Sequence, residues 1–239
     1  MGWFNHSHVP QYLERNPIFR FVFLFRKLFL TKQRQFYFGQ EAEDVALRRI
    51  FPKHFKGFFV DVGCFHPIKY NNTYYLYKKG WRGINIDIDT IKIKGFNWVR
   101  RKDINIATAI SNKKGETDYW TNGFYSLVNT LEKPPEKKLK EFKKKKITCN
   151  TLSNIIDDTK YKNQVIDLLC IDAEGHDLVV LQSLDFDRYD PKVIVVETFA
   201  KDMKMILDLP IFRYLEEKNY TLINWVGLSL FFKKKDLIF

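Results

Sequence analysis

The chain has 239 residues, 45% of them hydrophobic, which is enough for one substantial core and favours one domain over two. Forty Lys and Arg residues against 28 Asp and Glu give a net charge of +12, which suggests an anionic partner: phospholipid, nucleic acid or a phosphorylated glycan carrier. Cys64, Cys149 and Cys170 fit neither a zinc site nor a disulfide framework, so we expect a reducing, cytoplasmic location.

The N-terminal segment, residues 1–38, is basic and aromatic. Five cations accompany the phenylalanines of residues 17–34: Arg20, Arg26, Lys27, Lys32 and Arg34. Its apolar run is too short to span a bilayer, and no small-residue cleavage site of a signal peptide follows it. Two interpretations remain open: a helix packed on the domain, or a helix that makes peripheral contact with an anionic membrane.

Residues 57–89 predict a strand, a helix and a second strand. Phe58 to Val62 is a short run of strand-forming residues that Gly63 ends, residues 73–79 form a short helix, and residues 84–88 are again apolar. This pattern is a βαβ unit, whose strands are parallel and whose crossover is right-handed.

The rest of the chain continues this alternation. The other predicted helices are residues 39–51, 90–98, 152–156, 173–184 and 201–218, the last interrupted at Pro210; the other predicted strands are 105–110, 117–121, 147–149, 165–172, 193–197, 220–226 and 228–233. The last two form an antiparallel hairpin. Residues 131–146 are rich in lysine without an apolar face, and we expect a solvated, partly helical insertion. The pattern predicts an α/β three-layer sandwich.

Two acids mark the βαβ unit as a ligand site. Asp61 is near the carboxyl end of the first strand and Asp87 is near that of the second, and open parallel sheets bind ligands outside these ends. A carboxylate at Asp87 can accept hydrogen bonds from both ribose hydroxyls, with Asp89 as the substitute if the strand is longer. The first turn has the single glycine Gly63 instead of Gly-x-Gly-x-x-Gly, which disfavours NAD and FAD and leaves S-adenosylmethionine as the candidate.

Four ordered sequence blocks carry a more specific resemblance. They are residues 60–73 (VDVGCFHPIKYNNT), 79–87 (KGWRGINID), 171–177 (IDAEGHD) and 195–198 (VVET). Between about Gly39 and Gly227 the chain resembles the FkbM family of S-adenosylmethionine-dependent methyltransferases. It departs from many members at His66-Pro67, where they carry Gly or Ala. The resemblance implies a Rossmann-like, mostly parallel sheet of about seven strands with a C-terminal antiparallel hairpin, in one domain over residues 39–239.

The candidate cofactor-binding residues follow the first two blocks and the third strand: Asp61, Gly63, Asn72, Thr73, Asp87, Asp103 and Ser111. Asp61 either organises the loop beneath the methionine end of the cofactor or caps the next helix. Asp103 precedes the third strand, where adenine contacts commonly fall in such sheets, but it could equally be a solvated loop acid.

The candidate catalytic residues are Asp172, Glu174, His176 and His66. Methyl transfer to oxygen requires removal of the hydroxyl proton, which a carboxylate or histidine can perform. The alternative for Glu174 and His176 is a role in stabilising a helix N-terminus. Glu197, at the end of a later strand, is expected to line the acceptor pocket. We predict no metal site.

The function that these observations favour is O-methylation of a hydroxyl group on a sugar or glycan precursor. A nucleic-acid methyltransferase is one alternative, but the chain lacks the Asn/Asp-Pro-Pro-Tyr motif of enzymes that extrude a base, and we expect no nucleic-acid partner. The other alternative is a non-catalytic membrane-peripheral protein, against which Asp61, Gly63 and Asp87 argue.

Overall fold

A computed structural model describes residues 16–29, 36–123 and 125–237. The chain divides into two compact units, residues 1–36 and 37–239. The described part of the first unit holds one helix, α2 (Pro17–Phe29). Lys32 and Arg34, counted among the cations of the N-terminal segment, lie outside the described residues.

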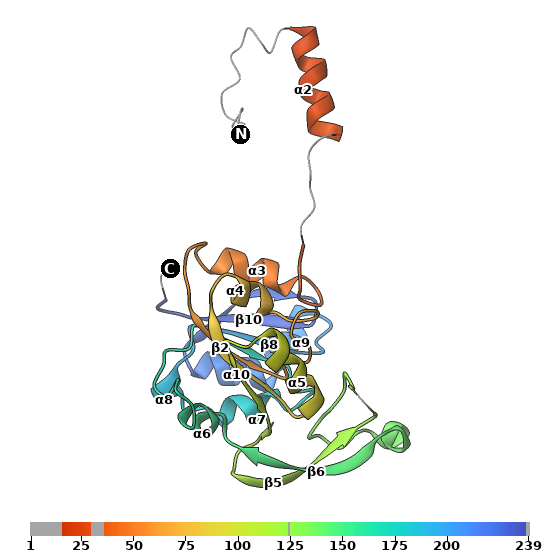
Figure 1. The fold of residues 1–239 in the computed structure, drawn as a ribbon, viewed down its shortest axis with the longest axis vertical. Helices are drawn as coiled ribbons and strands as arrows, with labels where there is room; N and C mark the ends of the chain where they lie inside the picture. The colour runs from red at the N-terminus through yellow and green to blue at the C-terminus, as the bar shows by residue number, and fades with distance from the viewer. Residues whose placement is uncertain (1–15, 30–35, 124, 238–239) are drawn as a thin grey trace. The chain divides into compact units, whose positions relative to one another are not determined.

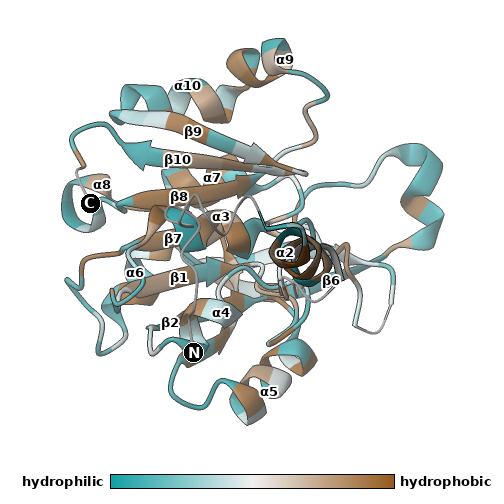
Figure 2. Cartoon of the chain, turned by 90° about the horizontal axis from the view of Figure 1, so that it is seen from above, coloured by the Kyte–Doolittle hydropathy of each residue, from teal (hydrophilic) through white to brown (hydrophobic). Residues whose placement is uncertain are grey.

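The second unit is built on a seven-stranded sheet with the order β3-β2-β1-β7-β8-β10-β9 (Figures 1 and 2). Its strands are β1 (Phe58–Val62), β2 (Arg82–Asp87), β3 (Ile104–Ala107), β7 (Leu168–Ile171), β8 (Val193–Glu197), β9 (Tyr220–Val226) and β10 (Ser229–Lys234). The first five are parallel, and β10 runs antiparallel to both β8 and β9. The predicted mostly parallel sheet with a C-terminal antiparallel hairpin is confirmed.

Helices cover both faces of this sheet (Figure 1). One face packs on α6 (Leu152–Asp157), α7 (Asp177–Gln182), α8 (Phe186–Tyr189), α9 (Met203–Asp208) and α10 (Pro210–Glu217). The other packs on α3 (Glu43–Ile50) and α4 (Tyr74–Lys78), while α5 (Thr90–Val99) lies against β2 and β3. The central strands are buried on both faces, as parallel strands under two helical layers must be.

A second sheet was not predicted. Its order is β4 (Ala109–Ile110), β6 (Lys143–Asn150) and β5 (Gly115–Thr121), and a 3₁₀ helix, η1 (Glu136–Glu141), precedes β6. The predicted third strand over residues 105–110 is therefore wrong as one element, since β3 joins the main sheet and β4 joins the small one. Residues 131–146 are mostly exposed and contain η1, as expected of a solvated, partly helical insertion, but the strand at Lys143 to Lys146, the start of β6, was not predicted.

Charge pairing offsets part of the repulsion within a run of four lysines that forms a strand. Lys144 contacts Asp118 at 2.6 Å and Lys146 contacts Glu116 at 4.0 Å, both acids lying on the neighbouring strand β5. Opposite charges on adjacent strands stabilise an antiparallel pair, whereas like charges would weaken it.

The strand order places the ligand crevice of the sheet. From β1 the chain builds outward through β2 and β3, and it then returns to the other side of β1 with β7 and β8. The order therefore reverses between β1 and β7. Open α/β sheets bind ligands outside the carboxyl ends of the strands at such a switch point.

Candidate functional site

A cavity of about 490 Å³ opens at this switch point. On one side it is lined by Asp87, Thr108 and Ile110, and on the other by Asp172, Glu174 and Glu197. Residues from the segment that joins β5 to β6 close it: Leu127, Val128, Asn129, Leu131 and Lys138. The cavity therefore extends from the end of β2 to the end of β8, with β1 between them.

Gly63 lets the loop after β1 pass close to β7. Its φ of 74° is a left-handed conformation that glycine adopts readily. A Cβ at this position would overlap the carbonyl oxygen of Asp172. Glycine is therefore required here by two independent constraints, its backbone conformation and its close approach to Asp172.

Asp61 holds the loop that follows β1. Its buried carboxylate accepts hydrogen bonds from Thr73 Oγ1 at 2.7 Å and from Asn71 Nδ2 at 3.2 Å. Burial raises the pKa of Asp61, while the hydrogen bond from Thr73 and the charge of Arg100 lower it. Asp61 and Asn72 also line a smaller adjoining cavity of about 50 Å³. Thr73 is fully buried and lines neither cavity, so its contact is with Asp61.

Arg100 braces the same loop and was missed by the sequence analysis. Its guanidinium is fully buried and donates to Asp103 Oδ2 at 2.9 Å, Asn71 Oδ1 at 3.2 Å and Thr73 Oγ1 at 3.1 Å. An arginine at the end of a helix is ordinarily solvated. Only its tertiary partners reveal the role, so the sequence carried no signal for it.

Asp87 is the last residue of β2 and faces the large cavity. Its Oδ1 accepts from the Asp89 amide at 2.8 Å, its Oδ2 accepts from the Phe65 amide at 3.1 Å, and Lys92 Nζ lies 3.5 Å from Oδ2. Burial raises the pKa of Asp87, and the charge of Lys92 opposes that shift. Asp89 instead caps α5 by accepting from the Ile91 amide, and it does not line the cavity.

Two candidate cofactor contacts lie elsewhere. Asp103 precedes β3 at its amino end, where it accepts from Arg100 and the Gly83 amide. Ser111 follows β4 and donates its amide to the Asn150 carbonyl. Neither residue lines the cavity, whose wall on this side comes from Thr108 and Ile110. Thr108 and Ile110 were missed because one unbroken strand was predicted over residues 105–110.

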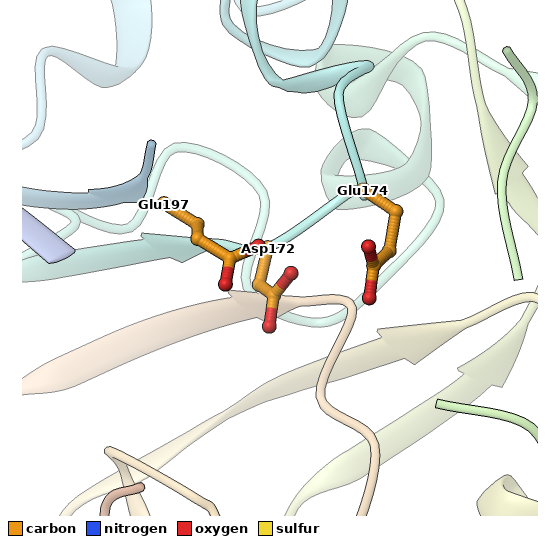
Figure 3. Close-up of side chains that lie close together, drawn as sticks. All are labelled: Asp172, Glu174 and Glu197. Atoms are coloured by element: carbon orange, nitrogen blue, oxygen red, sulfur yellow. The ribbon is translucent and has the colours of Figure 1, made fainter. Parts of the chain in front are cut away.

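Three carboxylates form the centre of the site (Figure 3). Asp172 follows β7, Glu197 ends β8 and Glu174 lies in the loop before α7, and each offers an oxygen within 4.8 Å of the others. Three carboxylate oxygens at this separation can share protons or coordinate a hard divalent cation. The sequence analysis did not predict a metal site, and it placed Glu197 only in the acceptor pocket.

The carboxylates shift one another's proton affinity. Asp172 and Glu197 lie close enough for their carboxyl groups to share a proton. Burial raises the pKa of Glu197 to about 9, and the charge of Asp172 adds to that shift. Burial also raises the pKa of Glu174 to about 7, and the charges of Asp172 and Asp177 add to it. The cluster therefore retains protons near neutral pH while Glu174 is poised to exchange one.

Glu174 has an unusual backbone conformation. Its φ of 51° is left-handed, which is uncommon for a residue other than glycine, and Gly175 follows with a φ of 94°. Thr130 Oγ1 donates to the Glu174 carbonyl at 2.9 Å, and the carboxylate of Asp177 accepts from the amides of Ala173 and Gly175. These bonds hold Glu174 in a conformation that costs free energy, as is common at functional sites.

The two histidines occupy different environments. His176 lines the cavity at the start of α7, with Nδ1 2.7 Å from Glu132 Oε1 and a buried Nε2 that has no hydrogen-bond partner among the described residues. His66 lies outside the cavity lining, and its Nδ1 accepts from the amides of Ile68 and Lys69 at 3.0 Å. His66 thus stabilises its own turn, which is a structural role and not a catalytic one.

The chain is similar to known methyltransferases in sequence and in structure. The profile of the methyltransferase FkbM domain matches residues 61–222. A search of curated proteins found no match. Among solved structures, a methyltransferase FkbM from Methylobacillus flagellatus KT is similar at 14% identity and a TM-score of 0.47, over 86% of this chain and 46% of that protein. The chain thus spans less than half of that relative's length.

A second solved structure covers nearly the whole chain. It is a TehB-like SAM-dependent methyltransferase from Corynebacterium glutamicum ATCC 13032 Kitasato, with 14% identity and a TM-score of 0.42 over 95% of this chain and 100% of that protein.

Proposed function

Because the chain belongs to the methyltransferase FkbM domain family, we propose that it is an S-adenosylmethionine-dependent O-methyltransferase that acts on a hydroxyl group of a sugar or glycan precursor. The observation that carries this proposal is one cavity with a ribose-type acid, Asp87, on one side and a proton-holding carboxylate cluster on the other. A reducing, cytoplasmic location is part of the proposal, since Cys64, Cys149 and Cys170 are free thiols.

The residues present fit the cofactor. Asp87 has further lone pairs for ribose hydroxyls beyond those its two amide bonds use. Gly63 keeps side-chain atoms out of the floor between the two halves of the cavity. Asp61 and Asn72 border the smaller adjoining cavity, whose acidic lining suits the ammonium of the methionine end. When bound, S-adenosylmethionine supplies a methyl group on a positively charged sulfur.

The acceptor half of the cavity is suited to a polyhydroxyl compound. Carboxylates only accept hydrogen bonds when ionised, and sugar hydroxyls donate them. Asn129 adds a buried Oδ1 that has no hydrogen-bond partner within the described part of the chain. Lys138 supplies a cation on the cavity wall, and the exposed side chains of Leu127 and Phe199 supply apolar surface. This combination favours an acceptor that carries an anionic group and an apolar part, such as a lipid-linked sugar phosphate.

We assign removal of the acceptor proton to Glu174. Its pKa of about 7 makes the ionised form available near neutral pH, and the strained backbone fixes the carboxylate in the cavity. The Asp172–Glu197 pair shares a proton beside it, so only part of the cluster carries negative charge. Asp172 is the second candidate, since burial raises its pKa to about 6.

Transfer of a labelled methyl group tests the proposal. Wild-type protein would be incubated with methyl-labelled S-adenosylmethionine and one acceptor at a time: lipid-linked saccharides, free saccharides, RNA or DNA. We expect label in a saccharide as an alkali-stable methyl ether, and a loss of about 10²–10⁴-fold in the Glu174→Gln variant. Label in nucleic acid, or an alkali-labile methyl ester, would contradict the assigned acceptor.

A further inference from the structure

The helix of the first unit, α2 (Pro17–Phe29), is not used by the proposed methyl transfer. It has 13 residues with the sequence PIFRFVFLFRKLF. At 1.5 Å per residue it is about 20 Å long, shorter than the roughly 30 Å hydrocarbon core of a bilayer. Among residues 16–29, 36–123 and 125–237, no helix is long and apolar enough to cross a membrane.

One side of α2 is apolar and exposed. Its large exposed hydrophobic side chains are Ile18, Phe21, Val22, Leu24 and Phe25, with 74% of Ile18 and 69% of Phe21 accessible. At 100° per residue these five positions fall within an arc of about 160°. The rings of Phe21 and Phe25 stack with their centroids 6.3 Å apart, which makes a continuous aromatic surface one turn long. Figure 2 shows the helix coloured as strongly hydrophobic.

The charged residues of α2 are all cations. Arg20 and Arg26 fall outside the apolar arc, where the stacked rings of Phe19 and Phe23 also lie, and the helix contains no acid. The whole chain carries a net charge of +12. An apolar arc bordered by cations is the arrangement of helices that lie in the interface of an anionic bilayer, where the apolar side chains enter the acyl region and the cations meet phosphate groups.

We propose that α2 is a membrane-surface helix that binds the chain to anionic phospholipid, with the side chains of Ile18, Phe21, Val22 and Phe25 inserted and with Arg20 and Arg26 at the headgroups. Charge complementarity favours an anionic partner. The width of the apolar arc favours a bilayer over an acidic protein, because so wide an arc can be buried in a fluid apolar phase. The proposal does not depend on the methyltransferase function. It places the enzyme at the surface where a lipid-linked acceptor would be found.

Flotation of the full chain with vesicles tests the proposal. The vesicles would be pure phosphatidylcholine, or phosphatidylcholine with one quarter phosphatidylglycerol, at 0.1 M and 0.5 M NaCl. We expect binding to the anionic vesicles that weakens at high salt, because salt screens exposed charges. Arg20→Gln/Arg26→Gln should weaken binding by about 25-fold, near fivefold for each cation. Phe21→Ala/Phe25→Ala, which keeps helix-forming residues, should weaken it at least tenfold.

The matched control is Lys113→Gln/Lys114→Gln, which removes two exposed cations from the turn before β5. It should bind vesicles within about threefold of wild type. Wild-type protein that does not bind anionic vesicles would overturn the proposal, as would α2 variants that bind like wild type. Thermal unfolding of each variant shows whether it is folded. If the phenylalanine variant melts at a lower temperature and the arginine variant binds normally, α2 packs on protein and the proposal fails.

Discussion

Glu174 is the residue on which the proposed chemistry depends most. Its backbone is held in a left-handed conformation by Thr130, and its carboxylate lies in the cavity beside Asp172 and Glu197. Both features oppose the intrinsic preferences of a glutamate, which favours solvent and a right-handed backbone. A residue held in an unfavourable conformation and environment is a candidate for function, and the carboxylate of Glu174 lines the cavity that an acceptor would enter.

Replacing Glu174 by Gln should reduce kcat by about 10²–10⁴-fold and leave the Kd for S-adenosylmethionine unchanged. A base acts when deprotonated, so wild-type kcat should be lost as pH falls through about 7, the pKa of Glu174. The pH profile of the residual activity should lack this limb. Steady-state kinetics from pH 5 to pH 9 would show both effects. Full turnover in Glu174→Gln together with a severe loss in Asp172→Asn would move the base to Asp172.

Glu197 should reduce stability as the pH rises. Its pKa is raised in the folded state, so the folded chain binds more protons than the unfolded chain between pH about 4.5 and about 9. The free energy of unfolding therefore falls with pH across this window. Glu197→Gln removes the effect and should raise Tm by at least about 2 °C at pH 8 and by much less at pH 5. Equal Tm differences at the two pH values would show that the carboxyl group is not protonated.

Removal of divalent cations distinguishes the two roles open to the carboxylate cluster. If the cluster shares protons, as we propose, dialysis against EDTA should leave kcat and Tm within experimental error. A loss of activity that Mg²⁺ or Ca²⁺ restores would instead assign Asp172, Glu174 and Glu197 as metal ligands, and the Glu174 assignment would then be wrong.

At the scale of the elements, the loop between β1 and α4 is fixed by very few residues. Gly63 lets it pass close to the end of β7, Asp61 and Asn71 hold it, and Arg100 braces it from the end of α5. The sequence predicted the turn at Gly63, because a glycine after an apolar run is a strong local signal. It could not predict the role of Arg100, whose partners in this loop, Asn71 and Thr73, lie 29 and 27 residues away in the chain.

Gly63→Ala should destabilise the second unit, because its Cβ would overlap the Asp172 carbonyl and its φ is positive. We expect a loss of at least about 2 kcal/mol. Gly95→Ala is the matched control: it lies within α5, where the new Cβ would meet only Pro67 at 3.9 Å. Alanine is the better helix former, so this variant should gain up to about 1 kcal/mol. Urea denaturation of both variants measures the difference, and equal stabilities would refute the close approach of the two loops.

The second sheet shows the limit of local sequence patterns. Four consecutive lysines, 143–146, have no apolar alternation, so periodicity gives no strand. Asp118 lies opposite Lys146, and Lys144 and Lys146 contact Asp118 and Glu116, but this pairing is known only once β5 and β6 are adjacent. The place of Thr108 and Ile110 in the cavity lining was not predicted for a related reason. The break between β3 and β4, where these residues lie, has no local sequence signal.

For the molecule as a whole, the alternation of strands and helices predicted the layered α/β class but not the second sheet. Short apolar runs marked the central strands, with Gly57 and Gly63 bounding the first, and the resemblance to the FkbM family supplied their approximate number. Placing Asp87 in the cavity needed only the rule that ligands bind at the carboxyl ends of parallel strands. Bringing Glu197 to Asp172 needed the strand order, which the sequence does not contain.

Calorimetric titration of S-adenosylmethionine into wild type, Asp87→Ala and Asp89→Ala tests whether the cavity at the switch point holds this cofactor with its ribose on Asp87. Wild type should bind with a Kd between micromolar and sub-millimolar values. Asp87→Ala should bind about 10–150-fold more weakly, equivalent to roughly 1.5–3 kcal/mol for two charge-assisted hydrogen bonds, while Asp89→Ala stays within a few-fold of wild type. Absence of binding by folded wild-type protein, or equal binding by wild type and Asp87→Ala, would contradict the account.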